Sequence, residues 1–120
     1  MSKTIKDLTK EEVEAEVLRL GRENPDYVYQ TDGRSNCFYH KSNVDEECNG
    51  CIFGQAFQNL GVSREWLAEN TLLGGNSISI EDLWEEYHDE ESPDSWGIIQ
   101  NEQDLEKRWG ECVGFLMGND

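Results

Sequence analysis

Apolar residues recur at helical spacing in several stretches of the chain, and polar residues that can cap a helix precede them. Thr9 followed by Glu12 has the form of a capping box, in which each side chain satisfies a backbone N–H group of the other. Val13 and Val17 then recur on one helical face. The pattern therefore predicts a first helix over about residues 10–20.

The same signals predict further helices along the chain. Ser63 and Ser79 are suitable caps for two of them, and Ser92 followed by Pro93 is typical of a third start. A glycine, Gly61, is placed to end the helix before Ser63. The additional helices are expected over about residues 51–60, 64–69, 80–89 and 94–116, the last with a break near Gly97 or Gly110.

Two short stretches favour extended structure instead. Residues 26–30 and 36–41 are rich in aromatic and β-branched side chains, and an Asp-Gly turn lies between them. They predict a small β-hairpin. We therefore expect residues 1–120 to form a single α+β domain that is mostly helical and contains one short hairpin.

Charge narrows the range of functions. The chain has 26 acidic and 10 basic residues, a formal net charge of −16, and no apolar run long enough for a membrane span. The N-terminal stretch lacks the apolar core of a secretory signal. Direct binding to nucleic acid through its phosphates requires clustered Lys and Arg, which are missing. These observations predict a protein of the cytosol that binds neither nucleic acid nor membrane.

The acids are concentrated on the predicted helix 80–89. Like charges four residues apart repel, so a helix that carries several such pairs either relies on its apolar face or keeps the charge for a partner. A solvated surface and a surface for a basic groove, or one that imitates nucleic-acid phosphates, both fit this pattern. Trp84 or Tyr87 would serve as anchors if they are exposed. The candidate partner-binding residues are Glu81, Asp82, Glu85, Glu86, Asp89, Glu90 and Glu91.

Cysteines suggest an alternative function. In a reducing cytosol they should be thiols or metal ligands rather than disulfides. A small zinc module would use three thiols and one imidazole, from Cys37, His40, Cys48 and Cys51. Their spacing is not a standard one, and buried thiols explain the pattern equally simply, so we expect no bound zinc and no cofactor. A redox dithiol formed by Cys48 and Cys51 is disfavoured by the acidic loop that precedes them.

No arrangement typical of a catalytic site is evident. His88 lies among carboxylates but has no Ser, Cys or Lys partner in the pattern that would make it catalytic. The expectation is a protein that is not an enzyme.

Several spaced motifs follow one another in a fixed order along the chain. They are Pro25-Asp26-x-Val28-Tyr29, Cys37-x-Tyr39, Gly50-Cys51-Ile52-x-Gly54-x-Ala56-x-x-x-Leu60-Gly61-Val62, Gln100-x-x-Gln103-Asp104 and Trp109-Gly110-x-x-Val113. This order resembles small uncharacterised accessory proteins of actinobacterial bacteriophages. The resemblance implies that the protein acts in the cytoplasm of an infected bacterium, by binding a host protein and inhibiting or redirecting it, and it implies no catalytic residues. The acidic charge adds the expectation that this host protein has a basic surface.

Overall fold

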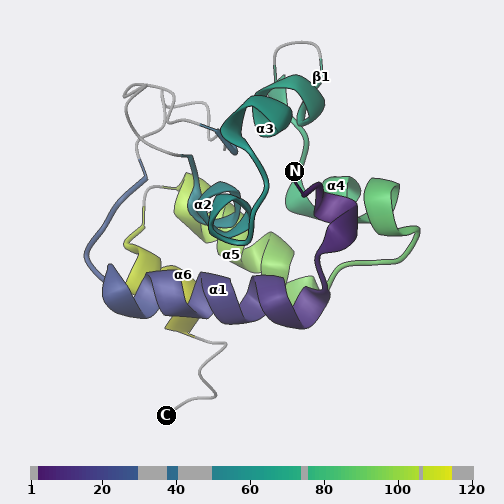
Figure 1. Ribbon diagram of the computed structural model, residues 1–120. Helices are drawn as coiled ribbons and strands as arrows, with labels where there is room; N and C mark the ends of the chain where they lie inside the picture. Colours follow the sequence, from purple (N-terminus) through teal and green to yellow (C-terminus); the bar gives the residue numbers. More distant parts are fainter. Residues whose placement is uncertain (1–2, 30–37, 41–49, 74–75, 106, 115–120) are drawn as a thin grey trace.

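The computed structural model describes residues 3–29, 38–40, 50–73, 76–105 and 107–114 of the 120-residue chain. Its described helices pack around one another without a sheet between them (Figure 1). In chain order they are the 3-10 helix η1 (Ile5–Asp7) and the α-helices α1 (Lys10–Glu23), α2 (Ile52–Asn59), α3 (Arg64–Asn70), α4 (Ile80–His88), α5 (Asp94–Asp104) and α6 (Trp109–Val113).

The capping box predicted for the first helix is confirmed. The backbone N–H of Glu12 donates to Thr9 Oγ1 (3.1 Å), and the N–H of Thr9 donates to Glu12 Oε1 (3.0 Å). Leu8 before the cap and Val13 after it are both buried, as expected of a hydrophobic staple. The helix runs to Glu23, three residues beyond the predicted end. A capped and stapled start thus fixes where α1 enters the fold.

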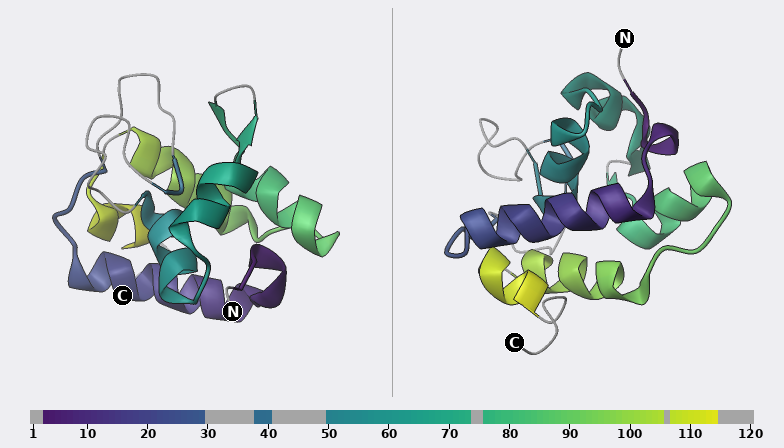
Figure 2. Two further views of the ribbon diagram at one scale, coloured as in Figure 1. Left: turned by 45° about the horizontal axis from the view of Figure 1, so that its top comes forward. Right: turned by 60° about the horizontal axis from the view of Figure 1, so that its bottom comes forward.

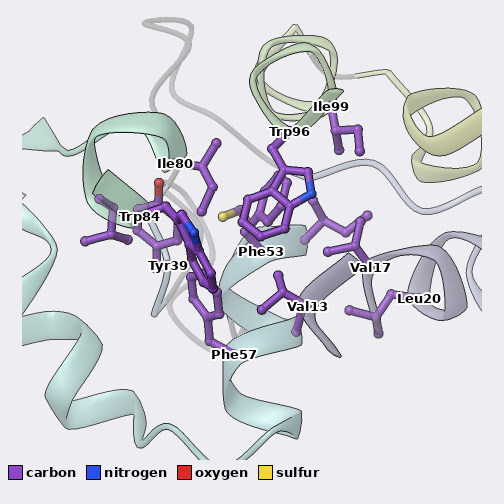
Figure 3. Close-up of a cluster of buried hydrophobic side chains, with 14 of the residues drawn as sticks. Val13, Val17, Leu20, Tyr39, Phe53, Phe57, Ile80, Trp84, Trp96 and Ile99 are labelled. Carbon is purple, nitrogen blue, oxygen red and sulfur yellow. The ribbon is translucent and has the colours of Figure 1, made fainter. Parts of the chain in front are cut away.

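The hydrophobic core lies where four helices meet (Figure 3). Phe53 of α2 packs against Trp96 of α5, with ring centroids 5.6 Å apart. Trp96 in turn meets Trp84 of α4 edge-to-face at 5.0 Å, a favourable arrangement for two aromatic rings. Val13 and Val17 contribute the buried side of α1. These aromatic contacts join α2, α4 and α5, and they set the orientation of the acidic helix α4.

The predicted α+β class is wrong, because the described backbone forms almost no β structure. The strands β1 (Leu72–Leu73) and β2 (Asn76–Ser77) pair over two residues each. Within the first predicted strand, Val28 forms an isolated bridge with Arg108, and Tyr27 accepts a hydrogen bond from the N–H of Trp109 (2.9 Å). The β-forming side chains of this stretch therefore hold a non-helical segment against α6. Residues 30–37 and 41 of the predicted hairpin lie outside the described residues.

The middle helices confirm the predictions from their caps and apolar stripes. Ser63 Oγ accepts from the N–H of Trp66 at the start of α3, and Ser79 Oγ accepts from the N–H of Asp82 at the start of α4. Gly61 follows α2 with φ +114°, a conformation that favours glycine. The predicted final helix 94–116 is two helices in the structure. The break lies between Asp104, the end of α5, and Trp109, the start of α6. No described helix is long and apolar enough to cross a membrane.

A close backbone approach explains one of the spaced motifs. A Cβ atom on Gly54 would overlap the carbonyl oxygen of Tyr39, and one on Gly50 would overlap the same oxygen. Gly50 also has φ +107°. The N–H of Cys51 donates to the carbonyl of Phe38 (3.0 Å), which ties this segment to the start of α2. The glycines at these two positions are thus required by packing.

Candidate functional site

Helix α4 separates its apolar and acidic residues onto opposite sides. Ile80, Leu83 and Trp84 are completely buried. The seven acids predicted to bind a partner are all exposed, and we call them the acidic face: Glu81, Asp82, Glu85, Glu86, Asp89, Glu90 and Glu91. The buried side anchors the helix in the core, so the repulsion among these carboxylates is offset by packing.

Four members of the acidic face surround one hollow. A cavity of about 300 Å³ is lined by Glu81, Asp82, Glu85, Glu91 and Ser92. It brings together acids from α4 and from the segment that leads into α5. Because the described residues that line it include no cation, the hollow concentrates negative potential at one place on the surface.

Two of these acids are stabilised by helix ends. Glu81 and Asp82 lie in the first turn of α4, where the helix dipole favours negative charge. Glu81 also lies against the first turns of α5, since a Cβ atom on Gly97 would come within 2.7 Å of Glu81 Cδ. These two carboxylates therefore have a structural role in addition to any role in binding.

Glu90 is the one member of the acidic face that is paired with a described cation. Its Oε2 lies 3.2 Å from Lys10 Nζ of α1 and accepts a hydrogen bond from Trp84 Nε1 (3.3 Å). The hydrogen bond from Trp84 and then the contact with Lys10 lower the pKa of Glu90. Glu90 thus links α4 to α1 and contributes less free negative charge than its neighbours.

The remaining acids have no such compensation. Among the described residues, no ion pair joins Glu85, Glu86, Asp89 or Glu91 to a cation. Asp89 is also in an unfavourable place: it caps the C-terminus of α4 with φ 52°, where the helix dipole disfavours a carboxylate. Among the described contacts, none shows these four carboxylates stabilising the fold.

The aromatic residues of α4 are not the exposed anchors that the sequence allowed. Trp84 is fully buried and stacks on His88, with ring centroids 3.7 Å apart. Tyr87 is partly buried and packs against Trp66 of α3 at 5.3 Å. His88 lies 2.8 Å, through Nε2, from the carbonyl oxygen of Ile5 in η1. These rings fasten α4 to neighbouring helices.

The cysteines differ from the sequence prediction. Cys51 is disulfide-bonded, so the expectation that it is a free thiol is wrong and its sulfur is not available as a zinc ligand in this state. Cys112 is a free thiol, and burial raises its pKa to about 12. Both side chains are fully buried. His40 is partly buried, whereas Cys37 and Cys48 lie outside the described residues.

The sequence did not reveal a buried polar network on α5. Gln100 Oε1 accepts from the N–H of Ile80, the first residue of α4 (2.8 Å), and Gln103 Oε1 accepts from the N–H of Ile52, the first residue of α2 (2.6 Å). Gln100 Nε2 donates to the hydroxyl of Tyr39 (2.8 Å). Each glutamine thus serves as a cap for another helix. The signal for this network in the sequence is that Gln100 and Gln103 fall on the same helical stripe as Trp96.

Asp104 ends this network as a partly buried acid. Its Oδ1 accepts a hydrogen bond from Gln103 Nε2 (2.9 Å), but burial dominates and raises the pKa of Asp104 to about 7. The carboxyl group also lies in the last turn of α5, where the helix dipole disfavours the charged form. Ionised Asp104 is therefore a cost to the fold at neutral pH.

We predict that Asp104→Asn stabilises the protein at high pH only. An unfolded Asp titrates near pH 4 whereas native Asp104 keeps its proton up to about pH 7, so the associated stability is lost progressively as the pH rises from about 4 to about 7. Allowing for partial exposure to solvent, the variant should gain about 1–2 kcal/mol in free energy of unfolding at pH 8 and little at pH 4. Urea denaturation of both proteins across this range measures the difference. A gain that did not depend on pH would contradict the assignment.

Comparison with protein-family models, with curated proteins and with solved structures finds no match to this chain. The resemblance to bacteriophage accessory proteins therefore stays a prediction. The residues of its motifs that the structure describes have packing roles, as Gly54 and Gln103 illustrate.

Proposed function

We propose that the protein is a non-enzymatic binding protein whose acidic face binds a protein with a basic surface. The observation that supports this proposal is the group of exposed acids without a described cation, Glu85, Glu86, Asp89 and Glu91, around a helix that is buried on its other side. A rigid, uncompensated negative surface speeds association with a positive one and disfavours other partners.

The predicted bacteriophage setting gives this proposal its biological form. The partner would be a host protein in the cytoplasm of the infected bacterium, which the acidic face inhibits or redirects. Exposed carboxylates present negative charge as nucleic-acid phosphates do, so a host protein that binds nucleic acid is the class we favour. In that case the protein would compete with DNA by mimicry.

The test compares two doubly substituted variants that remove the same charge. Glu85→Gln/Glu86→Gln alters the acidic face, whereas Glu65→Gln/Glu69→Gln removes two exposed acids from α3. We expect a host protein captured by the parent to bind the α4 variant about tenfold more weakly and the α3 variant unchanged. Added salt should weaken the parent complex, because the Debye length falls from about 10 Å at 0.1 M to about 3 Å at 1 M.

Equal binding of the captured protein to all three chains would contradict the proposal, and so would an affinity that is independent of salt. Release of the captured protein by a short DNA duplex would support mimicry; retention would restrict the proposal to a basic surface that does not bind DNA. Thermal unfolding of each variant provides the control for folding. Neither pair of residues contributes a buried side chain, so both variants should keep the parent melting temperature or exceed it.

A further inference from the structure

Helix α5 leaves two large apolar side chains in solvent. Ile98 is 50% exposed and Leu105, directly after the helix, is 55% exposed; they are the large hydrophobic residues exposed to this extent in the described part of the chain. They are seven residues apart, or two helical turns, and so lie on the same side. Asn101, one turn from each, is also exposed. The three residues form a stripe on the outer side of α5.

The core does not account for this stripe. The inner side of α5 is complete, with Trp96, Ile99, Gln100 and Gln103 all buried. In the right-hand view of Figure 2, α5 runs along the lower edge of the molecule, below α1. Single exposed apolar residues are ordinary, but a pair at i and i+7 on one helix is the spacing with which helices recognise each other.

The acidic face borders this stripe at its N-terminal end. The carboxylate of Glu81 lies against Gly97, the residue next to Ile98, so that a Cβ atom there would be 2.7 Å from Glu81 Cδ. Glu85 and Glu91 line the same hollow as Glu81. At the other end of α5 the charge is compensated, since Lys107 Nζ lies 2.7 Å from Glu102 Oε2. Among the described residues, unpaired carboxylates thus adjoin the apolar stripe at the N-terminal end of α5.

We infer that α5 and the adjoining carboxylates dock an amphipathic, basic α-helix of the partner protein. Its apolar residues would cover Ile98 and Leu105, and its Lys or Arg residues at one end would meet Glu81, Glu85 and Glu91. This inference rests on the proposed function and specifies the partner's chemistry. A second copy of the chain is a poor occupant, because each copy has a net charge of −16 and would repel the other.

The test uses a synthetic helical peptide as the probe. It has about 18 residues, with Leu at helical spacing on one face and Lys or Arg on the flanking positions near one end. A control peptide has the same composition in an order that disperses the Leu residues, so its net charge is identical. Fluorescence anisotropy measures the affinity of each peptide for the full chain at several salt concentrations.

Two double variants then separate the apolar and the charged contributions. Ile98→Gln/Leu105→Gln should weaken binding of the amphipathic peptide at least about tenfold, because two half-exposed side chains lose their apolar contact. Glu81→Gln/Glu85→Gln should also weaken it and reduce its salt dependence. Glu65→Gln/Glu69→Gln, an exposed acidic pair of the same spacing on α3, should leave it unchanged.

The outcomes distinguish this inference from the proposed function. If Glu81→Gln/Glu85→Gln weakens binding of the amphipathic peptide but Ile98→Gln/Leu105→Gln does not, the docking inference fails and the proposed function stands. The same holds if the dispersed peptide binds as tightly as the amphipathic one. If neither peptide binds the parent, the inference also fails. If Glu81→Gln/Glu85→Gln binds the amphipathic peptide as tightly as the parent, the docking inference fails, and the proposed function is decided by its own test on the captured host protein. Self-association of the parent that Ile98→Gln/Leu105→Gln abolishes would identify a second copy as the occupant and overturn the inference.

Discussion

Gly54→Ala should destabilise the protein by at least about 3 kcal/mol, a large fraction of the roughly 5–15 kcal/mol that holds a typical domain folded. A Cβ atom at this position of α2 would overlap the carbonyl oxygen of Tyr39. That oxygen also accepts a hydrogen bond from Gln58 Nε2 (3.3 Å). Backbone atoms on both sides of the overlap cannot rotate away as a side chain could, so one segment must move.

The consequence should spread beyond the contact itself. Tyr39 is fully buried, and its hydroxyl donates to the carbonyl of Ile78 (2.6 Å), just before α4. Displacing Tyr39 therefore disturbs the support of the acidic helix as well as α2. Urea denaturation followed by circular dichroism measures the loss.

Gly114→Ala is the matched control for this substitution. A Cβ atom on Gly114 would meet nothing within 4 Å, so the same added methyl group should change the free energy of unfolding by less than about 0.5 kcal/mol. If Gly54→Ala were as mild as Gly114→Ala, the close approach of Tyr39 to α2 would not exist in solution.

Local signals in the sequence were sufficient to predict where α1, α3 and α4 begin. The cap of α1 requires only Thr9 and Glu12, which are three residues apart, and the stripe of α4 requires only residues within two turns. Such signals say nothing about which segments meet. The stretch at Tyr27 and Val28 has the composition of a strand, yet it pairs with the start of α6 about 80 residues later. The predicted hairpin failed because its β-forming residues serve a long-range contact.

The candidate site likewise combines features that local sequence signals predict with contacts that they do not. Exposure of the acidic face followed from periodicity, because buried Leu83 and Trp84 leave the opposite side to solvent. The contact between Glu90 and Lys10 did not follow, since these residues are far apart in the sequence. Burial of Trp84 also depends on Trp96, which arrives from another helix. Sequence periodicity thus identifies a charged surface, whereas only the tertiary structure shows which of its charges are already paired.

Gln103→Leu should cost about 2–3 kcal/mol although it replaces a buried polar side chain by an apolar one of similar size. Gln103 Oε1 is the acceptor for the N–H of Ile52 (2.6 Å), and Ile52 is fully buried at the start of α2. Leucine fills the space but accepts no hydrogen bond. The N–H group would then be buried without a partner, which is the costly half of losing a hydrogen bond.

The location of the loss distinguishes this cause from a general packing defect. Amide hydrogen exchange should accelerate at Ile52 more than at Ile80, because Gln100 still caps the start of α4. Gln100→Leu should show the opposite pattern. Asn101→Ala, on the exposed side of the same helix, provides the control and should leave both amides protected. Suppose instead that Gln103→Leu left the free energy of unfolding unchanged and that the Ile52 amide stayed protected. The first N–H of α2 would then have another acceptor, and the buried glutamines of α5 would not be what holds α2 and α4 in place.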